Sequence, residues 1–488
     1  MANKYDLRYA IEILKKYNDQ IIKTKDEVDP HGQLAGIYRH IGAFGTVKRP
    51  TKIGPAMMFE NIKGFNNARV LIGLLSSRQR LGYLLEEKPE NLSKKLIKAL
   101  DNPIKPIKVA EGSCQEVVHL ASEPDFDIRK ILPAPTNTLE DAGPYFTMGM
   151  CYATDPITRE SDVTIHRLCL QSKDEISMFF TPGVRHLDAF RKKAEADNQP
   201  LPISISIGVD PAIEIASCFE SPTTPLGYNE LQIVGGLRDQ AVELVKCKTV
   251  DEYCIANAEY VIEGELLPRL RVREDLNSNT GKAMPEFPGY TEPANPSLPI
   301  IKVKAITHRK NPIMQTVIGP SEEHVSLAGI PTEASILRMI EQAMPGKVLN
   351  VYCPSFGGGK FVAIIQFKKE LPSDEGRQRQ AALLAFSAFS ELKHVYIVDE
   401  DVDIFDINDV MWAMTTRFQG DVDVVTIPGV RTHPLDPSND PDYSSSIYDH
   451  GIACKTIFDG TVPYHLKDCF KRADFMDVDL SKWQVEKY

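Results

Sequence analysis

The chain has 488 residues, of which 42% are hydrophobic and 25% charged, a composition typical of a globular protein of two to four domains. Its net charge of -11 argues against a nucleic-acid-binding role, so an anionic substrate would need a local basic pocket. No apolar run approaches the roughly 18 residues of a membrane span, and no membrane partner is expected.

The N-terminal segment MANKYDLRYAIEILKKYND carries charges throughout, which predicts an amphipathic helix rather than a secretion signal. The nine cysteines are odd in number, scattered and never spaced C-x-x-C. This distribution argues against a disulfide framework or a zinc knuckle. We therefore expect reduced thiols and a cytoplasmic location.

The first two regions differ in their hydrophobic patterns. Residues 1–115 combine helical periodicity at 7–17 and 92–100 with a short strand at 69–75, and predict an N-terminal α/β domain. The Pro- and Asp-rich stretch 103–140 predicts a long extended connection. Residues 116–310 predict a β-rich domain, a barrel or split barrel with one helix at 187–196, from strand-like runs at 147–155, 162–172, 175–183, 202–210, 243–250, 259–266 and 300–308.

Residues 311–488 predict a C-terminal α/β domain that ends in an arm. Its expected helices lie at 332–344, 375–390 and 407–418, and its expected strands at 347–354, 360–369, 394–401 and 422–429. The acidic run at 399–406 lacks the glycine of a calcium loop, so a solvated strand end is expected there. The fold class is therefore α/β with a central β-rich domain.

The run SDVTIHR at 161–167 is the first candidate for chemistry. In a strand, Asp162, Thr164 and His166 share one face, and Ile165 and Arg167 share the other. Taken alone, this pattern is also that of a half-buried strand with a solvated charge.

Two further segments offer metal ligands. FFTPGVRHL at 179–187 turns into Arg185 and His186, and PTTPLGYNELQIVGGL at 222–237 carries Glu230 in an otherwise apolar run. A carboxylate there must be exposed, paired or metal-bound. Together with Asp162, these side chains suit Mg²⁺ or Mn²⁺, although spacing alone does not show that they meet.

Glu286 lies in TGKAMPEFPGY, between prolines and aromatic residues. Scarce water there favours the protonated carboxyl, which suits a proton donor; a solvent-facing loop glutamate is the alternative. His324, Lys360 and His433 each lie next to turn residues. GGGK at 357–360 is not a P-loop, because G-x-x-x-x-G-K-[ST] is absent.

These segments occur together in one known family. The chain resembles, over nearly its whole length, the UbiD family of prenylated-FMN-dependent decarboxylases, and most of all the branch that acts on protocatechuate and gallate. The stretches that carry the resemblance include AGIYRHIGAFGTVKRP, LPAPTNT, DVTIHR, PTTPLGYNEL, GKAMPEFPGY, GPSEEHVSLAGIPTEAS, GGGKF and HPLDPS.

The resemblance implies a flavin-reductase-like split barrel that binds prenylated FMN together with Mn²⁺ or Mg²⁺, and K⁺ is a further candidate ion. The metal would be held by Asp162, His186 and Glu230. The residues that would bind the cofactor are Asp162, Thr164, Ile165, His166, Arg167, Arg185, His186, Ser217, Cys218 and Glu230. A flavin prenyltransferase would supply the cofactor, and the protein would form a homodimer or a larger homo-oligomer.

The resemblance further implies that Glu286 donates the proton and Arg167 orients it. One departure concerns a second glutamate that many members carry five residues before the donor, where this chain has Gly281. Glu274 and Asp275 lie upstream but out of register, which leaves open whether the chain has the complete glutamate–arginine–glutamate network.

The expected reaction is the reversible, non-oxidative decarboxylation of 3,4-dihydroxybenzoate or gallate to catechol or pyrogallol. His324, Lys360 and His433 would handle the phenolic oxygens, with His433 or Lys360 accepting the phenolic proton. In the alternative, His433 only caps a turn before Pro434. The alternatives for the whole chain are a 4-hydroxybenzoate decarboxylase, a non-catalytic subunit of a multi-subunit aryl carboxylase and an unrelated α/β enzyme.

Overall fold

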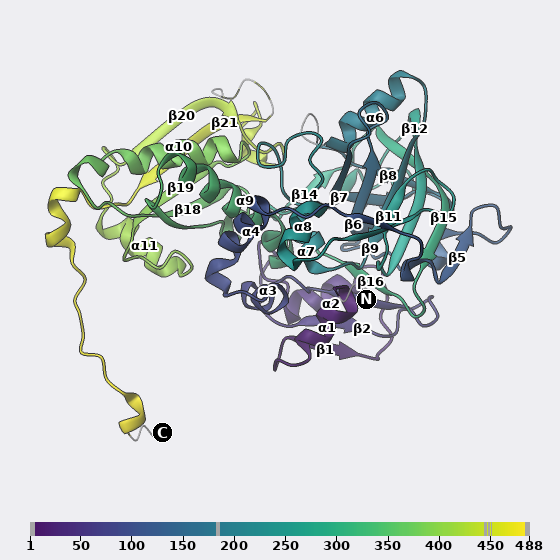
Figure 1. Ribbon diagram of the computed structural model, residues 1–488, viewed down its shortest axis with the longest axis horizontal. Coiled ribbons are helices and arrows are strands. Elements are labelled where there is room, and N and C mark those ends of the chain that lie inside the picture. The colour runs from purple at the N-terminus through teal and green to yellow at the C-terminus, as the bar shows by residue number, and fades with distance from the viewer. Residues whose placement is uncertain (1–4, 182–185, 444–446, 448, 450, 484–488) are drawn as a thin grey trace.

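The computed structural model describes residues 5–181, 186–443, 447, 449 and 451–483. It contains three large sheets: a central barrel, an N-terminal sheet below it and a C-terminal sheet beside it (Figure 1). The C-terminal segment leaves the last sheet as an extended arm. No helix in the described ranges combines the length and the apolar character needed to cross a membrane.

The central barrel is closed by six antiparallel strands, because its first and last strands, β12 and β15, pair with each other. This confirms the predicted β-rich middle. Strand β5 (Val117–Leu120) pairs with the end of β15, helix α6 (His186–Ala196) packs on the barrel, and α5 (Ile128–Ile131) lies in the connection that leads to it. The barrel order is β12 (Tyr260–Val272), β9 (Leu201–Ile207), β6 (Tyr145–Thr154), β7 (Ser161–Leu170), β8 (Glu175–Met178) and β15 (Leu298–His308).

A glycine and a bulge help β6 to bend around this barrel. The pairing of β6 with β7 shifts register between Phe146 and Gly149. A Cβ on Gly149 would lie 2.9 Å from side-chain atoms of Ile205 and Leu168. The close approach of neighbouring strands therefore requires glycine here.

The predicted strand at 243–250 forms, but outside the barrel. It is β10 (Glu243–Lys246), which pairs with β11 (Tyr253–Ile255) and with β4 (Ile107–Val109) in a separate three-stranded sheet. The sequence did not show that this strand lies outside the barrel, because alternation predicts a strand but not its partners.

The N-terminal sheet is built from two distant parts of the chain. Its strand order is β1 (Ile21–Thr24), β2 (Ala56–Phe59), β3 (Arg69–Ile72) and β16 (Ile313–Thr316). β16 follows the last barrel strand and pairs in parallel with β3. The surrounding helices are α1 (Leu7–Leu14), α2 (Gln33–Ile41), α3 (Arg78–Leu85), α4 (Leu92–Asp101), α7 (Pro211–Ala216) and α8 (Leu231–Arg238).

The C-terminal domain has the predicted α/β layering. Its sheet order is β17 (Val348–Tyr352), β18 (Val362–Phe367), β19 (His394–Asp399), β21 (Ile452–Asp459) and β20 (Val424–Arg431), with α10 (Arg377–Ala388) and α11 (Ile407–Thr416). β21 was not predicted. The acidic run is a strand end as expected: Asp399 closes β19, and Asp399 and Asp401 pair with Arg417.

Helix α9 (Glu322–Ala343) begins ten residues before its predicted start at 332. The predicted start directly follows Pro331, a residue type that usually interrupts a helix interior. In the structure Pro331 lies inside the helix, where Gly329, Ile330 and Thr332 are all buried. Tertiary packing along the whole helix therefore overrides the local cost of the proline.

Glu323 joins α9 to the N-terminal sheet. Its carboxylate is fully buried and accepts hydrogen bonds from the backbone N–H groups of Gly73, at 2.7 Å, and Leu75, at 3.0 Å. Burial raises the pKa of Glu323 to about 7, although these N–H groups act to lower it. The two N–H groups therefore favour the ionised carboxylate, whereas its burial away from water disfavours it.

We expect Glu323→Gln to gain stability relative to wild type as the pH rises from 5 to 8. The pKa of Glu323 lies near 7 in the folded chain, above its ordinary value of 4.5. Between pH 4.5 and 7 the carboxyl therefore ionises in the unfolded chain but not in the folded one, which lowers the stability of wild type as the pH rises. The relative gain is expected to be about 1–3 kcal/mol, since one pKa unit corresponds to about 1.4 kcal/mol. Denaturant unfolding of both proteins at each pH measures it, and a difference independent of pH would contradict the assignment.

Candidate functional site

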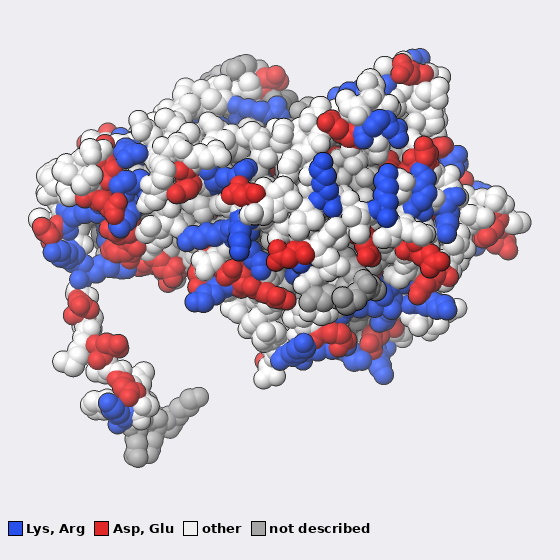
Figure 2. Space-filling model, in the orientation of Figure 1, with Lys and Arg blue, Asp and Glu red and all other residues white. Residues whose placement is uncertain are grey.

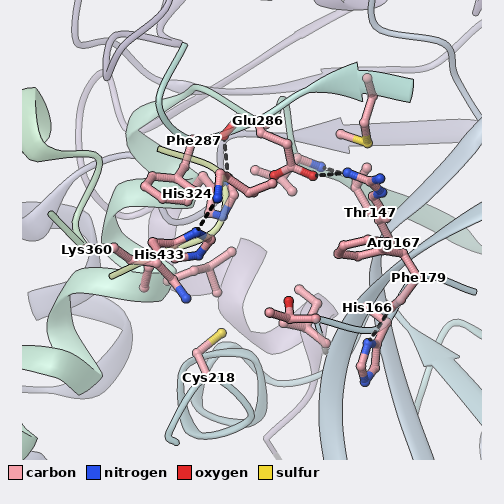
Figure 3. A pocket seen from close by; sticks show the side chains of 18 of the residues that line it. Thr147, His166, Arg167, Phe179, Cys218, Glu286, Phe287, His324, Lys360 and His433 are labelled. Carbon is pink, nitrogen blue, oxygen red and sulfur yellow. Dashed lines mark hydrogen bonds and ion pairs between the residues drawn. The ribbon is translucent and has the colours of Figure 1, made fainter. Parts of the chain in front are cut away.

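A cavity of about 140 Å³ lies where the barrel meets the C-terminal domain. Strand β7, the turn after α7, the hairpin of β13 (Lys282–Pro285) and β14 (Thr291–Pro293), helix α9 and two C-terminal loops all contribute to its wall. Figure 3 shows Arg167 and Glu286 in contact with each other, while His324, His433 and Lys360 lie away from Arg167. The residues that line it include Thr147, Ile165, His166, Arg167, Phe179, Cys218, Glu220, Met284, Glu286, Phe287, His324, Leu327, Lys360 and His433.

Arg167 is held between two carboxylates. Its Nη1 donates to Glu286 Oε1 at 2.6 Å, and its Nε and Nη2 lie 3.1 and 3.2 Å from the two oxygens of Glu274. The guanidinium carbon also lies 4.1 Å from the centre of the Phe179 ring. Burial disfavours the charge, but Glu286 and Glu274 outweigh it and raise the pKa of Arg167.

The glutamate–arginine–glutamate network that Gly281 placed in doubt is therefore present, with Glu274 as its second carboxylate. Glu274 is 1% exposed and also accepts hydrogen bonds from the Tyr145 hydroxyl and the backbone N–H of Asn295, both at 3.0 Å. Gly281 instead occupies a turn, with a φ of 71° and its N–H donated to Asp275. Spacing left this question open, because the sequence does not show that the loop after β12 returns Glu274 to Arg167.

The opposite wall of the cavity is polar. Lys360 Nζ lies 3.2 Å from Glu220 Oε1 and 3.6 Å from Glu391 Oε2. The same Glu391 oxygen lies 3.3 Å from His433 Nε2. Neither Glu220 nor Glu391 was identified from the sequence, because an isolated glutamate in a loop carries no pattern. An ammonium between two carboxylates is expected to keep its charge.

The two histidines of this wall have opposite hydrogen-bonding roles. The Nδ1 of His433 accepts the backbone N–H of Leu435 at 3.1 Å, so in neutral His433 the proton is on Nε2. The Nδ1 of His324 donates to the carbonyl oxygen of Gly319, which leaves its Nε2 as an acceptor. Burial lowers the pKa of His324, which favours the neutral form. His433 therefore caps a turn, as in the alternative above, and also lines the cavity.

Phe287 packs against both histidines of this wall. Its ring meets His324, His433 and Phe361 edge to face, at centroid distances of 5.8, 4.7 and 4.9 Å. The turn that carries Lys360 presses on the same ring: a Cβ on Gly358 would lie 2.4 Å from Phe287 Cδ2. Glycine at this position, where φ is 61°, is thus needed for the contact.

The three predicted metal ligands meet. One ligand atom from each of Asp162, His186 and Glu230 lies within 4.8 Å of the others, and His186 Nδ1 is 3.1 Å from Asp162 Oδ1. Within the described chain, the buried atoms Asp162 Oδ2 and Glu230 Oε2 have no hydrogen-bond partner. Burial, and next the charge of Asp162, raise the pKa of Glu230. Two buried carboxylates with oxygens left over fit a divalent cation, which would satisfy both.

The other residues expected to bind the cofactor lie near β7 and α7. Ile165, His166 and Cys218 line the cavity, and His166 Nδ1 donates to the Phe179 carbonyl at 3.0 Å. Thr164 donates to the Ser217 carbonyl at 3.3 Å, whereas the Ser217 hydroxyl is turned inward and donates to the Glu214 carbonyl at 2.9 Å. Arg185 lies outside the described residues.

Comparison with known proteins identifies the family to which the chain is similar. Three family models match consecutive parts of the chain: the 3-octaprenyl-4-hydroxybenzoate carboxy-lyase N-terminal domain at residues 11–100, the Rift-related domain at 105–322 and the C-terminal domain at 325–460. A gallate decarboxylase of Lactiplantibacillus plantarum is 54% identical over 487 residues, which cover 99% of each chain.

Solved structures agree with this match. The apo 3,4-dihydroxybenzoic acid decarboxylase from Enterobacter cloacae is 58% identical, with a TM-score of 0.94 and 98% of each chain covered. An evolved dimeric form of the UbiD-class enzyme HmfF from Pelotomaculum thermopropionicum, in complex with prFMN, is 32% identical, with a TM-score of 0.83 and 99% of each chain covered. The chain therefore belongs to the UbiD family of carboxy-lyases.

Proposed function

We propose that the protein catalyses the reversible, non-oxidative decarboxylation of 3,4-dihydroxybenzoate or gallate and depends on prenylated FMN. The single observation that carries this proposal is the cavity with the Arg167–Glu286 pair at one end and Lys360 and His433 at the other. A benzoic acid with hydroxyls opposite its carboxylate matches both ends. The gallate and 3,4-dihydroxybenzoic acid decarboxylases at 54% and 58% identity support the substrate class.

The prFMN complex of the HmfF relative supports the cofactor. When bound, prenylated flavin supplies the electron sink that loss of CO₂ from an aryl carboxylate requires. Ile165, His166 and Cys218 would contact the flavin, and a Mn²⁺ or Mg²⁺ ion on Asp162, His186 and Glu230 would hold its phosphate. The unpartnered carboxylate oxygens of Asp162 and Glu230 support the ion.

The protein's own part of the reaction is orientation and proton delivery. Arg167 presents a planar fork that suits a carboxylate, so it can orient the substrate while it holds Glu286. Glu286 then gives a proton to the ring carbon that has lost CO₂. Glu274 keeps Arg167 in place throughout, because it binds the guanidinium through two oxygens.

The cofactor would come from a separate flavin prenyltransferase, and the protein would form a homo-oligomer in the cytoplasm. The C-terminal arm supports self-association. Beyond η6 (Tyr464–Phe470) it extends from the body in Figure 1 with large apolar side chains exposed, among them Phe475 and Met476 at 87% and Trp483 at 67%. Exposed apolar segments of this kind mark association surfaces.

Glu286→Gln tests the proton donor. We expect it to keep the bound cofactor and to lower decarboxylation by about 10²-fold or more, the contribution typical of general acid catalysis. Release of ¹³CO₂ from labelled 3,4-dihydroxybenzoate measures the rate, and flavin absorbance measures occupancy. Glu292→Gln removes a neighbouring carboxylate that interacts with Glu286 and Arg167 through longer-range electrostatics, so it controls for the loss of negative charge beside the pair. Turnover of Glu286→Gln within a few-fold of wild type would mean that the proton comes from elsewhere.

Glu230→Ala tests the metal site. We expect it to lose most of the bound divalent ion and, with it, the phosphate anchor of the flavin. Asp162→Asn is the control, because an amide still offers oxygen to the ion and should retain it. Elemental analysis and flavin content of the purified proteins give the answer. Equal metal content in Glu230→Ala and wild type would place the ion elsewhere.

His433→Phe tests the polar end of the cavity. A site built to hydrogen-bond a hydroxyl rejects analogues that lack it, by up to about 10⁴-fold, so wild type should not act on benzoate or cinnamate. His433→Phe should lose activity on 3,4-dihydroxybenzoate and gallate far more than it disturbs flavin binding. Rates on a panel that includes 4-hydroxybenzoate measure the preference. An unchanged preference would leave His433 with only its turn-capping role.

A further inference from the structure

Glu220 is a cavity-lining carboxylate without an assigned role. It lies on the turn after α7, and its carboxylate is 3.2 Å from Lys360 Nζ. Both side chains are almost enclosed, with exposed fractions of 12% and 10%. Glu391 approaches the same Nζ to 3.6 Å but does not line the cavity. A ring hydroxyl that reaches Lys360 therefore also meets Glu220.

The other polar groups of this wall are poorly suited to accept the hydroxyl proton. Lys360 is an ammonium held by two carboxylates, and neutral His433 carries its proton on Nε2 because Leu435 donates to Nδ1. His324 offers an acceptor nitrogen, but protonating it would create a second buried cation beside Lys360. Burial lowers the pKa of His324; Glu286 and the Gly319 carbonyl oppose this effect, and the charge of Lys360 adds to it.

We propose that Glu220 is a further catalytic residue, the carboxylate that accepts the proton of the substrate's ring hydroxyl. This inference rests on the proposed function, since it requires a hydroxylated aromatic substrate. It replaces His433 and Lys360 in the role that the sequence suggested for them.

The step conserves charge within the site. The O–H bond of the hydroxyl breaks, its proton bonds to a Glu220 oxygen, and the electron pair stays on the ring oxygen. The negative charge thus moves from the carboxylate to the phenolate, and Lys360 faces both. Glu391 remains a counter-ion of Lys360 throughout. After CO₂ has left, the proton returns from Glu220 to the oxygen. A phenolate para to the carboxylate increases electron density at the carbon that must react.

A chromogenic ligand can report the proton transfer directly. In 4-nitrocatechol a nitro group takes the place of the carboxylate, and its visible absorbance reports ionisation of the hydroxyl. The holoenzyme is titrated at a pH where the free ligand is neutral. We expect the wild type to bind the ionised ligand without releasing a proton to the buffer, because Glu220 retains it. Calorimetry in buffers of different ionisation enthalpy measures proton release.

Glu220→Gln should ionise the ligand only at higher pH and with release of a proton, and should decarboxylate 3,4-dihydroxybenzoate about 10²-fold more slowly. Glu391→Gln removes the other carboxylate of the same ammonium and should still bind the ionised ligand without proton release. Glu220→Asp retains a carboxylate of shorter reach and should recover part of the activity. It also serves as the test if Glu220→Gln does not fold.

Three outcomes would overturn the inference. In the first, wild type releases the proton on binding. In the second, Glu220→Gln binds the ionised ligand as wild type does. In the third, His324→Gln abolishes proton retention while Glu220→Gln keeps it, which would make His324 the acceptor. A wild type that decarboxylates no hydroxybenzoate would contradict the proposed function instead, and the titration would still report on Glu220.

Discussion

The ion cluster of Arg167 with Glu274 and Glu286 is the constraint on which the site depends. Moving a guanidinium out of water costs several kcal/mol. Removing a carboxylate partner of a buried guanidinium leaves buried charge that is no longer compensated. Two carboxylates that approach from the β12–β13 connection and from the end of β13 compensate Arg167 on both edges of its fork. A substrate carboxylate adds a negative charge to this cluster. The charge remains on the ring when neutral CO₂ departs, and it passes to Glu286 when that residue gives its proton to the ring carbon.

The polar wall that faces this cluster across the cavity is formed by another part of the chain. Arg167 lies on a barrel strand, whereas Lys360 and His433 lie on loops of the C-terminal domain. Helix α9 spans the junction and brings His324 to the same cavity. On the face in Figure 2, Lys and Arg are interspersed with Asp and Glu, so this face offers no broad basic surface to the acid. Its recognition is left to the few buried charges of the cavity.

The sequence predicted well what depends on local pattern. Alternating β-branched runs located the barrel strands, and the resemblance located Asp162, His186 and Glu230, which the structure brings together. Contacts between residues that are distant in the sequence were harder to predict. Gly281 suggested a missing carboxylate, but a loop returns Glu274 to Arg167 from twelve positions before Glu286.

Glu220 and Glu391 were missed for a related reason. Each is a single glutamate in a loop, and only its contact with Lys360 in the folded chain identifies it as part of the site. Helix α9 shows a different kind of error: the helix continues through Pro331, although proline is unfavourable inside a helix, because the surrounding residues are buried. Local rules describe segments, whereas the site is defined by contacts between them.

The pairing of β3 with β16 has a consequence for how the chain is made. β3 ends at residue 72 and its partner begins at residue 313, after the entire barrel. A ribosome that adds about 5–20 residues per second needs roughly 10–50 s to reach β16. For that time the nascent N-terminal sheet exposes the edge of β3, which is a surface prone to wrong pairing. The barrel therefore folds beside an unfinished neighbour, and chaperone binding during synthesis should be concentrated in this interval.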